Sequence, residues 1–409
     1  MSSYHLLTAV LILCLTGPAL PAENPVEERP ANTASAASPA TTTATPRVDE
    51  PNAKAPHDVV VYSNGHRIPA IVLTKKGTLL AFAEHRLQSS DHGNVDLVVK
   101  RSSDGGKTWG EQILIHDAGS VASGNPCPVV DRDTDIVWLG FASNNNKLAM
   151  ITYSKDDGLN WAKPTDITKQ AKLDHWGWYA FGPCHGIQLK NGRLILHGNH
   201  HCPKGKGSAD PDPQGTHGHV VYSDDHGKTW RMGGVVPGHT SGESSVTESS
   251  DGSLYWNARS QGAGRRAVSR SADGGLTWSD AVLDSDLTEP KGSGGCQGNA
   301  IRFTDEIRHK QNRLLFCNPA DTKDRKDLTV YLSYDEAKTW QKCKVVKKGS
   351  ASYNDLVILP DLSIGCLYET NDGAWQRIRF ARFTLDWLTD GKDRIESKSN
   401  GRTAPSGSR

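Results

Sequence analysis

The chain has 409 residues, with 47 Lys and Arg residues against 46 Asp and Glu residues, so its formal net charge is +1. This balance argues against a nucleic-acid-binding protein, which usually carries a basic domain or stripe. Hydrophobic residues make up 36% and charged residues 23%, which is typical of a soluble globular protein and excludes a disordered chain or a polytopic membrane protein.

Residues 1–22 have most features of a secretory signal peptide. An apolar run over 6–15 is followed by small residues up to Ala22, near which we expect cleavage. The segment before the run has no Lys or Arg, which departs from the usual pattern. An uncleaved membrane anchor is the alternative, but about ten apolar residues are too few to span a bilayer. The sequence predicts an exported protein, periplasmic, cell-surface or extracellular, whose mature chain is not inserted in a membrane.

Two further segments are predicted to lie outside the fold. Residues 23–56 are rich in Pro, Ala, Thr and Ser, with almost no large apolar side chains, and 394–409 have a similar composition. Such segments bury too little surface to offset their ordering entropy, so we expect a disordered linker and a disordered tail. The predicted folded domain therefore spans 57–393.

Eight cysteines are present, and cleavage of the signal peptide would remove Cys14. The seven that remain are an odd number, so at least one is expected to stay unpaired or to bridge to another chain. No CxxC pair occurs. We expect mostly buried thiols, with one or two disulfide bridges at most.

A turn-like repeat organises the domain. Four segments share the pattern Ser-x-Asp-x-Gly-x-Thr-Trp, one of them with Asn for Thr, and a fifth has Ala337 in place of glycine; they begin at Ser102, Ser154, Ser223, Ser271 and Ser333. Asp accepts hydrogen bonds from the backbone that follows it, Gly supplies a positive φ, and the hydroxyls close the turn. We expect each Trp to start the next strand and to pack against its own motif. We interpret these repeats as structural turns.

The spacing of the repeats predicts the architecture. Their aspartates are 52, 69, 48 and 62 residues apart, so the domain holds about six units. A unit of this length fits a four-stranded sheet, and radial repetition of such sheets gives a β-propeller. The sequence predicts an all-β fold, a six-bladed β-propeller of four-stranded antiparallel sheets, with one blade lacking the repeat.

The candidates for chemistry are arginines, carboxylates and a tyrosine that the repeats do not explain. Taken singly, each is more simply interpreted as a surface ion-pair partner or a loop residue. Their combination in this order is what indicates a site. They are Arg67, Arg86, Asp91, Glu243, Arg259, Arg325, Tyr353 and Glu369.

In these motifs the chain resembles the exo-α-sialidases (neuraminidases) of glycoside hydrolase family 33, six-bladed propellers whose repeated turns are called Asp-boxes, or BNR repeats. The resemblance covers nearly all of 57–390. Asp-boxes alone also occur in non-enzymatic propellers, whereas the ordered set of three arginines with Asp, Glu and Tyr is specific. The motifs that carry it are Arg67-Ile68-Pro69, the loop ending at Asp91, Gly182-Pro183, the Glu243 segment, Asn257-Ala258-Arg259, Gly295-Cys296-Gln297-Gly298, Tyr353-Asn354-Asp355-Leu356 and Leu367-Tyr368-Glu369.

The resemblance implies a binding site for a carboxylate. Arg67, Arg259 and Arg325 would form a triad that clamps the carboxylate of the substrate, a task for which planar guanidinium groups are suited. Arg86 would line the same pocket, and Glu369 would orient Arg67.

The resemblance also implies the reacting groups. Tyr353 would be the nucleophile, Glu243 its general base, and Asp91 the acid/base at the leaving group. A neutral phenol suits a sugar that carries a carboxylate on its anomeric carbon, because that carboxylate would repel a carboxylate nucleophile. A phenol with an ordinary pKa near 10 needs a base in contact with it.

The implied function is that of a retaining exo-α-sialidase, which hydrolyses terminal sialic acid from sialylated glycans, glycoproteins or glycolipids without a metal or another cofactor. Two alternatives use the same residues, a trans-sialidase and a hydrolase of a related nine-carbon 2-keto acid. A third is a non-catalytic glycan-binding propeller. That reading predicts the loss of Tyr353 or Glu243, and both are present.

Some segments depart from the family pattern, and two could be considered as metal-binding sites. His197 to Cys202 stand where the family often has aromatic residues of the N-acetyl and glycerol subsites, and Cys184 stands where a glycine often follows Gly-Pro. We interpret the histidines as polar residues lining the pocket, with a zinc site as the alternative. The acidic stretch 131–135 does not match a calcium loop, because Ile136 occupies the position of the required glycine.

Overall fold

A computed structural model describes residues 56–395, except 89, 204–214, 239–241, 293 and 373–374. The predicted signal peptide, all but the last residue of the predicted linker, and 396–409 of the predicted tail lie outside the described residues. Within the described part, no helix has both the length and the apolar character needed to cross a bilayer.

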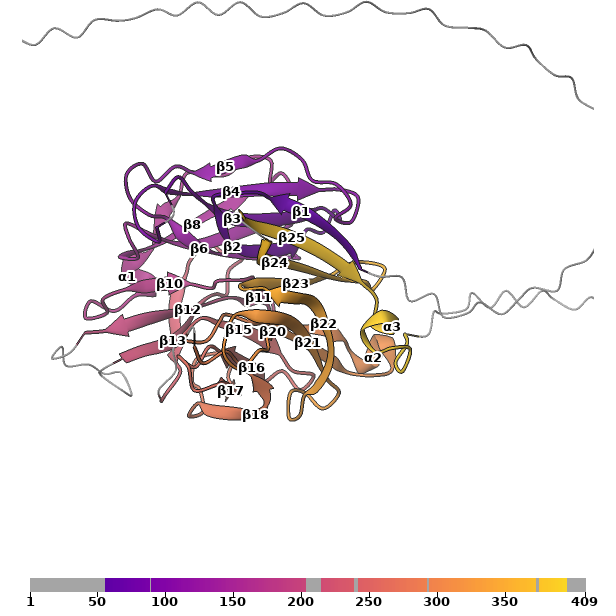
Figure 1. Cartoon of the computed structure of the whole chain (residues 1–409). Coiled ribbons are helices and arrows are strands. Elements are labelled where there is room, and N and C mark those ends of the chain that lie inside the picture. Colours follow the sequence, from indigo (N-terminus) through magenta and orange to yellow (C-terminus); the bar gives the residue numbers. More distant parts are fainter. Residues whose placement is uncertain are drawn as a thin grey trace, which may run out of the picture. The chain divides into compact units, whose positions relative to one another are not determined.

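The described chain forms six antiparallel sheets that follow one another in sequence order (Figure 1). This confirms the predicted all-β, six-bladed β-propeller. The first two blades comprise β2 (His66–Leu73), β3 (Leu79–Arg86), β4 (Val95–Ser102) and β5 (Ile113–His116), then β6 (Gly124–Val130), β7 (Val137–Ser143), β8 (Leu148–Ser154) and β9 (Thr165–Asp166).

The next three blades follow the same order. They comprise β10 (Tyr179–Phe181), β11 (Ile187–Gln188), β12 (Leu194–Cys202), β13 (Gly215–Ser223) and β14 (Arg231–Val235); β15 (Ser244–Glu248), β16 (Leu254–Ala258), β17 (Arg265–Ser271) and β18 (Val282–Thr288); and β19 (Asn299–Thr304), β20 (Arg313–Pro319), β21 (Lys326–Ser333) and β22 (Gln341–Ser350). The described chain has three single-turn helices. Two of them, α1 (Thr168–Ala171) and α2 (Glu306–His309), lie in connections between strands, and α3 (Leu385–Leu388) follows the last strand.

The sixth blade joins the two ends of the folded chain. It comprises β23 (Asn354–Ile358), β24 (Ile364–Asp372) and β25 (Trp375–Phe383), and its outer strand is β1 (His57–Tyr62), which pairs with β25. In the other five blades the turn repeat connects the third strand to the outer strand. No such turn exists in the sixth blade, because its outer strand comes from the other end of the domain. This explains the one blade without a repeat.

The third blade departs from the predicted four strands. Its inner edge consists of two short strands, β10 and β11, which both pair with β12. The residues between them include Pro183, which has no N–H to donate to the sheet, and Gly182 and Cys184, both with positive φ. The inner strand is therefore interrupted where the sequence has Gly-Pro-Cys.

Each Asp-box is held by contacts within a few residues of its own aspartate. In the first, Asp104 accepts hydrogen bonds from the backbone N–H of Thr108 at 3.0 Å and from its hydroxyl at 2.6 Å. Gly106 has a φ of +87°, and a Cβ there would lie 2.1 Å from the ring of Phe380 in the preceding blade. The ring of Trp109 packs edge-on against the same Phe380, at 5.5 Å between centroids. The turn chemistry is as predicted, but the tryptophan packs between blades and not only on its own motif.

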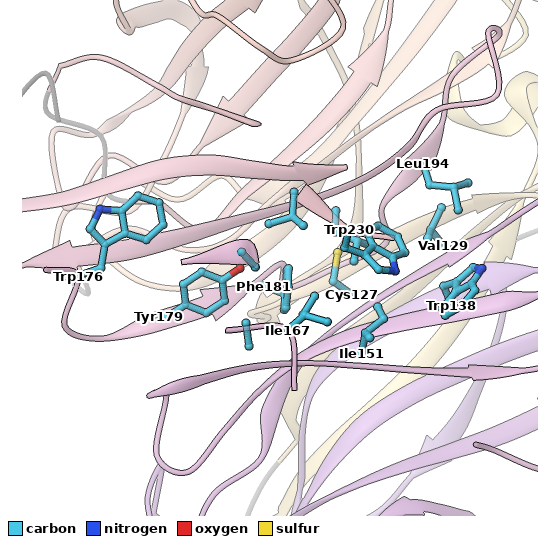
Figure 2. Packing of buried hydrophobic residues seen from close by; sticks show 14 of the residues in the cluster. Cys127, Val129, Trp138, Ile151, Ile167, Trp176, Tyr179, Phe181, Leu194 and Trp230 are labelled. Atoms are coloured by element: carbon cyan, nitrogen blue, oxygen red, sulfur yellow. The ribbon is translucent and has the colours of Figure 1, made fainter. Parts of the chain in front are cut away.

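The hydrophobic core lies in the spaces between blades. Figure 2 shows one such cluster, in which Cys127, Val129 and Ile151 of the second blade face Phe181 and Leu194 of the third. All seven cysteines of the described chain are free thiols, and six of them are buried. The expectation of buried thiols is correct, whereas no disulfide bridge links any of the described cysteines.

Candidate active site

The predicted site residues come together at one rim of the propeller. They lie at the starts of inner strands, the ends of second strands or the connections beside them, positions that the blade topology places at the same end of the central channel. A pocket of about 400 Å³ at this rim is lined by seven of the eight, Arg67, Arg86, Asp91, Glu243, Arg259, Arg325 and Tyr353. The eighth, Glu369, lines an adjoining hollow that shares Arg67, Arg86, Asp91 and Arg325 with the pocket.

A bulge in the first inner strand aims Arg67 into the pocket. The register of β2 against β3 shifts between Arg67 and Ala70, and Ile68 has a φ of 56°, which is rare for a β-branched residue. Glu369, 1% exposed, accepts hydrogen bonds from the backbone N–H of Ile68 at 2.7 Å and from Nη2 of Arg67 at 3.3 Å. One buried carboxylate thus holds both the bulge and the guanidinium. Burial opposes the charge of Arg67, but Glu369, together with Tyr353 and Glu84, outweighs this effect and raises the pKa of the arginine.

Tyr353 and Glu243 form a direct contact in the pocket. The Tyr353 hydroxyl donates to Oε1 of Glu243 at 2.5 Å, while Nη1 of Arg259 donates to Oε2 at 2.8 Å. Burial, and then the Glu243 carboxylate, raise the pKa of Tyr353 well above its ordinary value. The resting phenol is therefore protonated, and Glu243 lies in position to accept its proton as the oxygen attacks.

The other two arginines of the predicted triad are anchored from behind. Nε of Arg259 donates to the carbonyl of Gly294 at 2.7 Å, and Nε of Arg325 to the carbonyl of Gly295 at 3.2 Å. The guanidinium carbons of Arg67 and Arg325 both lie 5.3 Å from the centre of the Tyr353 ring. Three cations thus surround one phenol, an arrangement suited to an anionic substrate group.

Asp91 lies at the open side of the pocket, with 73% of its side chain exposed. Its Oδ1 contacts Nη1 of Arg86 and lies 3.6 Å from Nη1 of Arg67. Partial burial favours the neutral form, but Arg86 and then Arg67 outweigh it and lower the pKa of Asp91. The carboxylate is therefore ionised in the free protein.

The structure adds pocket residues to which the sequence motifs assigned no role. Glu84, Asn125, Asn146 and Trp178 also line the pocket, the last of them 37% exposed. The sequence could have indicated Glu84 as a pocket residue, because it lies two residues before Arg86 on β3, and side chains two apart on a strand share a face. The asparagines had no such indication, since they come from a different blade.

The histidine segment does not line this pocket in the part of the chain that is described, so that interpretation was wrong. It forms β12, and His197 is buried against Cys184, 3.6 Å from Nε2 to Sγ, and against the carbonyl of His185 at 3.1 Å. Burial lowers the pKa of His197 to about 4, so its ring is neutral.

The acidic stretch that fails the calcium pattern does place possible ligand atoms together. Asp131, Asp133 and His226 offer atoms within 4.8 Å of one another. However, the side-chain amide of Gln188 donates to Asp131 at 2.9 Å and to Asp133 at 3.0 Å. Each of these carboxylates therefore already accepts a hydrogen bond from the amide of Gln188.

Comparison with known proteins identifies the family. A family model described as a BNR repeat-like domain matches residues 77–367. The chain is 34% identical over 355 residues to a sialidase of Micromonospora viridifaciens, covering 79% of this chain and 52% of that protein, so it spans about half the length of this relative. It is 32% identical to Sialidase-2 of Rattus norvegicus, covering 78% of this chain and 92% of the relative.

Among solved structures, the Hadza microbial sialidase Hz136 has a TM-score of 0.68 at 27% identity, covering 79% of this chain and 66% of that chain. The family match spans the blades that carry Glu243, Arg259, Arg325 and Tyr353. The structural match shows that the fold is shared with this sialidase. By its repeats, its fold and its relatives, this chain belongs to the sialidase family.

Proposed function

We propose that this protein is a retaining exo-α-sialidase, a glycosidase that hydrolyses terminal sialic acid from glycans. The observation that carries the proposal is the 2.5 Å contact between the Tyr353 hydroxyl and Glu243, in a pocket that also contains Arg67, Arg259 and Arg325. A nucleophile in contact with a base, beside three cations, fits a sugar with a carboxylate on its anomeric carbon.

The first half of the reaction follows from these positions. The substrate carboxylate binds the three arginines, which brings the anomeric carbon over Tyr353. The phenolic oxygen attacks this carbon while Glu243 accepts its proton, and Asp91, after taking up a proton from solvent, donates it to the departing oxygen. A covalent aryl glycoside with Tyr353 and a free alcohol result.

The second half reverses these roles. Asp91, now a carboxylate, accepts a proton from water as the water attacks the same carbon, and Glu243 returns its proton to the phenolic oxygen of Tyr353. Two successive displacements at one carbon leave its configuration unchanged, so the sugar first released has the same anomeric configuration as the substrate.

The experiment is hydrolysis of an α-sialoside with a fluorescent leaving group, followed by NMR of the first sugar released. We expect release of the fluorophore and an α-configured first product, with no release from a neutral-sugar control. Adding an acceptor glycan tests the trans-sialidase alternative, since transfer yields a new sialoside in place of free sugar. Absence of turnover would contradict the enzymatic function, and a β-configured first product would contradict the Tyr353 nucleophile.

We further propose that the natural substrates are sialylated glycoproteins or glycolipids outside the cytoplasm. The predicted signal sequence over 1–22 supports export, and the exposed Asp91 at the open side of the pocket leaves room for a large leaving group. A chain truncated to begin at His57 is expected to be soluble and fully active, because β1 starts there. In full-length protein, N-terminal sequencing of the exported form is expected to begin near Glu23.

A further inference from the structure

Glu84 is a buried carboxylate in the pocket that the proposed reaction does not use. It lies on β3 opposite Arg67 of β2 and is 4% exposed. Its Oε2 accepts hydrogen bonds from Nε and Nη2 of Arg86, at 2.8 and 2.5 Å. Its Oε1 accepts from the backbone N–H of Asn125 at 2.8 Å. Both oxygens are engaged, so Glu84 connects the Arg86 guanidinium to the neighbouring blade.

The neighbouring blade is shaped to receive this carboxylate. A Cβ at Gly124 would lie 2.2 Å from Oε1 of Glu84, so the contact with Asn125 requires a residue without a side chain at this position. Asn125 has a φ of 58°, and the register of β6 shifts between Gly124 and Cys127. The irregular start of β6 at Gly124 and Asn125 therefore accommodates Glu84, which distinguishes it from an ordinary surface ion pair.

Arg86 passes this restraint on to Asp91. Its third nitrogen, Nη1, contacts Oδ1 of Asp91. Only 8% of the Arg86 side chain is exposed, against 73% of that of Asp91. The exposed carboxylate is thus positioned by a buried guanidinium, which is itself fixed by Glu84.

A general acid must carry a proton before it can give one to the leaving group. Among the described residues, the side chains that act most strongly on Asp91 are Arg86, Arg67 and His92, and all three favour its ionised form. A guanidinium paired with a second carboxylate attracts Asp91 less than an unpaired one would, because the two charges of the Glu84–Arg86 pair largely offset each other.

We propose that Glu84 is a positioning residue for the general acid: by holding and partly neutralising Arg86, it keeps Asp91 able to take up and donate a proton. The inference rests on the proposed sialidase function. In the free enzyme, activity on a substrate that needs acid assistance falls as the pH rises through the pKa of Asp91. Glu84 therefore places this alkaline limb at a higher pH than Arg86 alone would allow.

The test is the pH dependence of kcat/KM for a sialoside with a sugar leaving group. Glu84→Gln is expected to move the alkaline limb down by about 1 pH unit, and Arg86→Gln to move it up by a similar amount. Asp91→Asn identifies the limb, since this variant should lack it. If Glu84 acts through Arg86, adding Glu84→Gln to Arg86→Gln should produce no further shift.

The matched control is Glu336→Gln. Glu336 also pairs with a guanidinium, that of Arg302, and also accepts from a backbone N–H, that of Ser250 at 3.0 Å, but it does not line the pocket. The alkaline limb of kcat/KM for the Glu336→Gln variant should stay at the pH of the wild type. Opposite shifts for Glu84→Gln and Arg86→Gln support the inference, because a purely structural role would not reverse the direction.

The inference is overturned if the two variants shift the limb in the same direction, if neither does, or if Glu84→Gln still shifts it in the Arg86→Gln background. If circular dichroism shows that Glu84→Gln does not fold, the Arg86→Gln variant still tests the inference. An alkaline limb that stays in place or moves to lower pH in this variant would exclude control of Asp91 by Arg86, and with it the proposed role of Glu84. Failure of the function itself is separate, because then the wild type would not cleave the sialoside at all.

Discussion

The Asp-boxes and the pocket both use carboxylates that accept several hydrogen bonds, but they obtain their partners in different ways. Asp104 of the first box finds its donors at Lys107 and Thr108, within four residues along the chain. Glu369 finds its donors at Arg67 and Ile68, about 300 residues away. The boxes can therefore form in each hairpin by itself, whereas the pocket exists only once the first and last blades are joined.

This contrast predicts that substitutions in the pocket affect catalysis and substitutions in the boxes affect stability. The largest effect should come from Tyr353→Phe, which removes the nucleophilic oxygen and leaves the packed ring. We expect kcat to fall by at least about 100-fold, with thermal unfolding close to that of the wild type.

Glu243→Gln should lower kcat to a similar extent, because an amide cannot accept the phenolic proton. The double variant should lose little more than either single variant, since the two groups act as a unit. Single-turnover measurements on an aryl sialoside provide the comparison. Independent, multiplying losses would show that Tyr353 and Glu243 do not act in one step.

A second prediction compares two arginines. Arg325→Ala leaves a substrate carboxylate without one partner, which costs about 2–5 kcal/mol. At about 1.36 kcal/mol per tenfold change, kcat/KM should fall by about thirtyfold or more. Arg382→Ala is the control, because Arg382 donates to the carbonyl of Gly105 in the first box. It should lower the unfolding midpoint and leave kcat/KM within threefold of the wild type; the reverse pattern would refute the division between the two regions.

A third prediction concerns the contact between a box and the preceding blade. Gly106→Ala would place a methyl group 2.1 Å from the ring of Phe380 and at a φ of +87°. Overpacking of this kind costs about 1–3 kcal/mol, and the positive φ adds to it. Urea unfolding should show the loss, with kcat/KM unchanged in the folded fraction. A fully stable variant would mean that the glycine is not needed for blade packing.

The smallest effect is expected in the fifth box, where Ala337 already occupies the glycine position with a φ of 59°. Ala337→Gly relieves a left-handed conformation that costs about 1–2 kcal/mol. It also adds backbone entropy to the unfolded chain, which costs about 0.5–1 kcal/mol, and removes a buried methyl group. The free energy of unfolding should change by less than about 1 kcal/mol, as measured beside Gly106→Ala. A larger loss would show that this box relies on its methyl group for packing.

The sequence by itself determined the features that depend on short stretches of chain. The five Asp-boxes are readable because Ser, Asp, Gly and Thr satisfy one another within eight residues, and their spacing was enough to predict six blades. The site residues were identified by motif, since each motif is a short run of characteristic residues such as Arg67-Ile68-Pro69.

Only the tertiary structure decided how distant segments meet. The pairing of β1 with β25, the interruption between β10 and β11, and the burial of His197 away from the pocket depend on contacts between segments that lie far apart or carry no repeat. The restraint of Asp91 by Glu84 likewise requires β3, the loop after it and the start of β6 to be brought together. Such contacts leave no periodic pattern in the sequence, because each is made once, between side chains whose distance is set by the closed ring of blades.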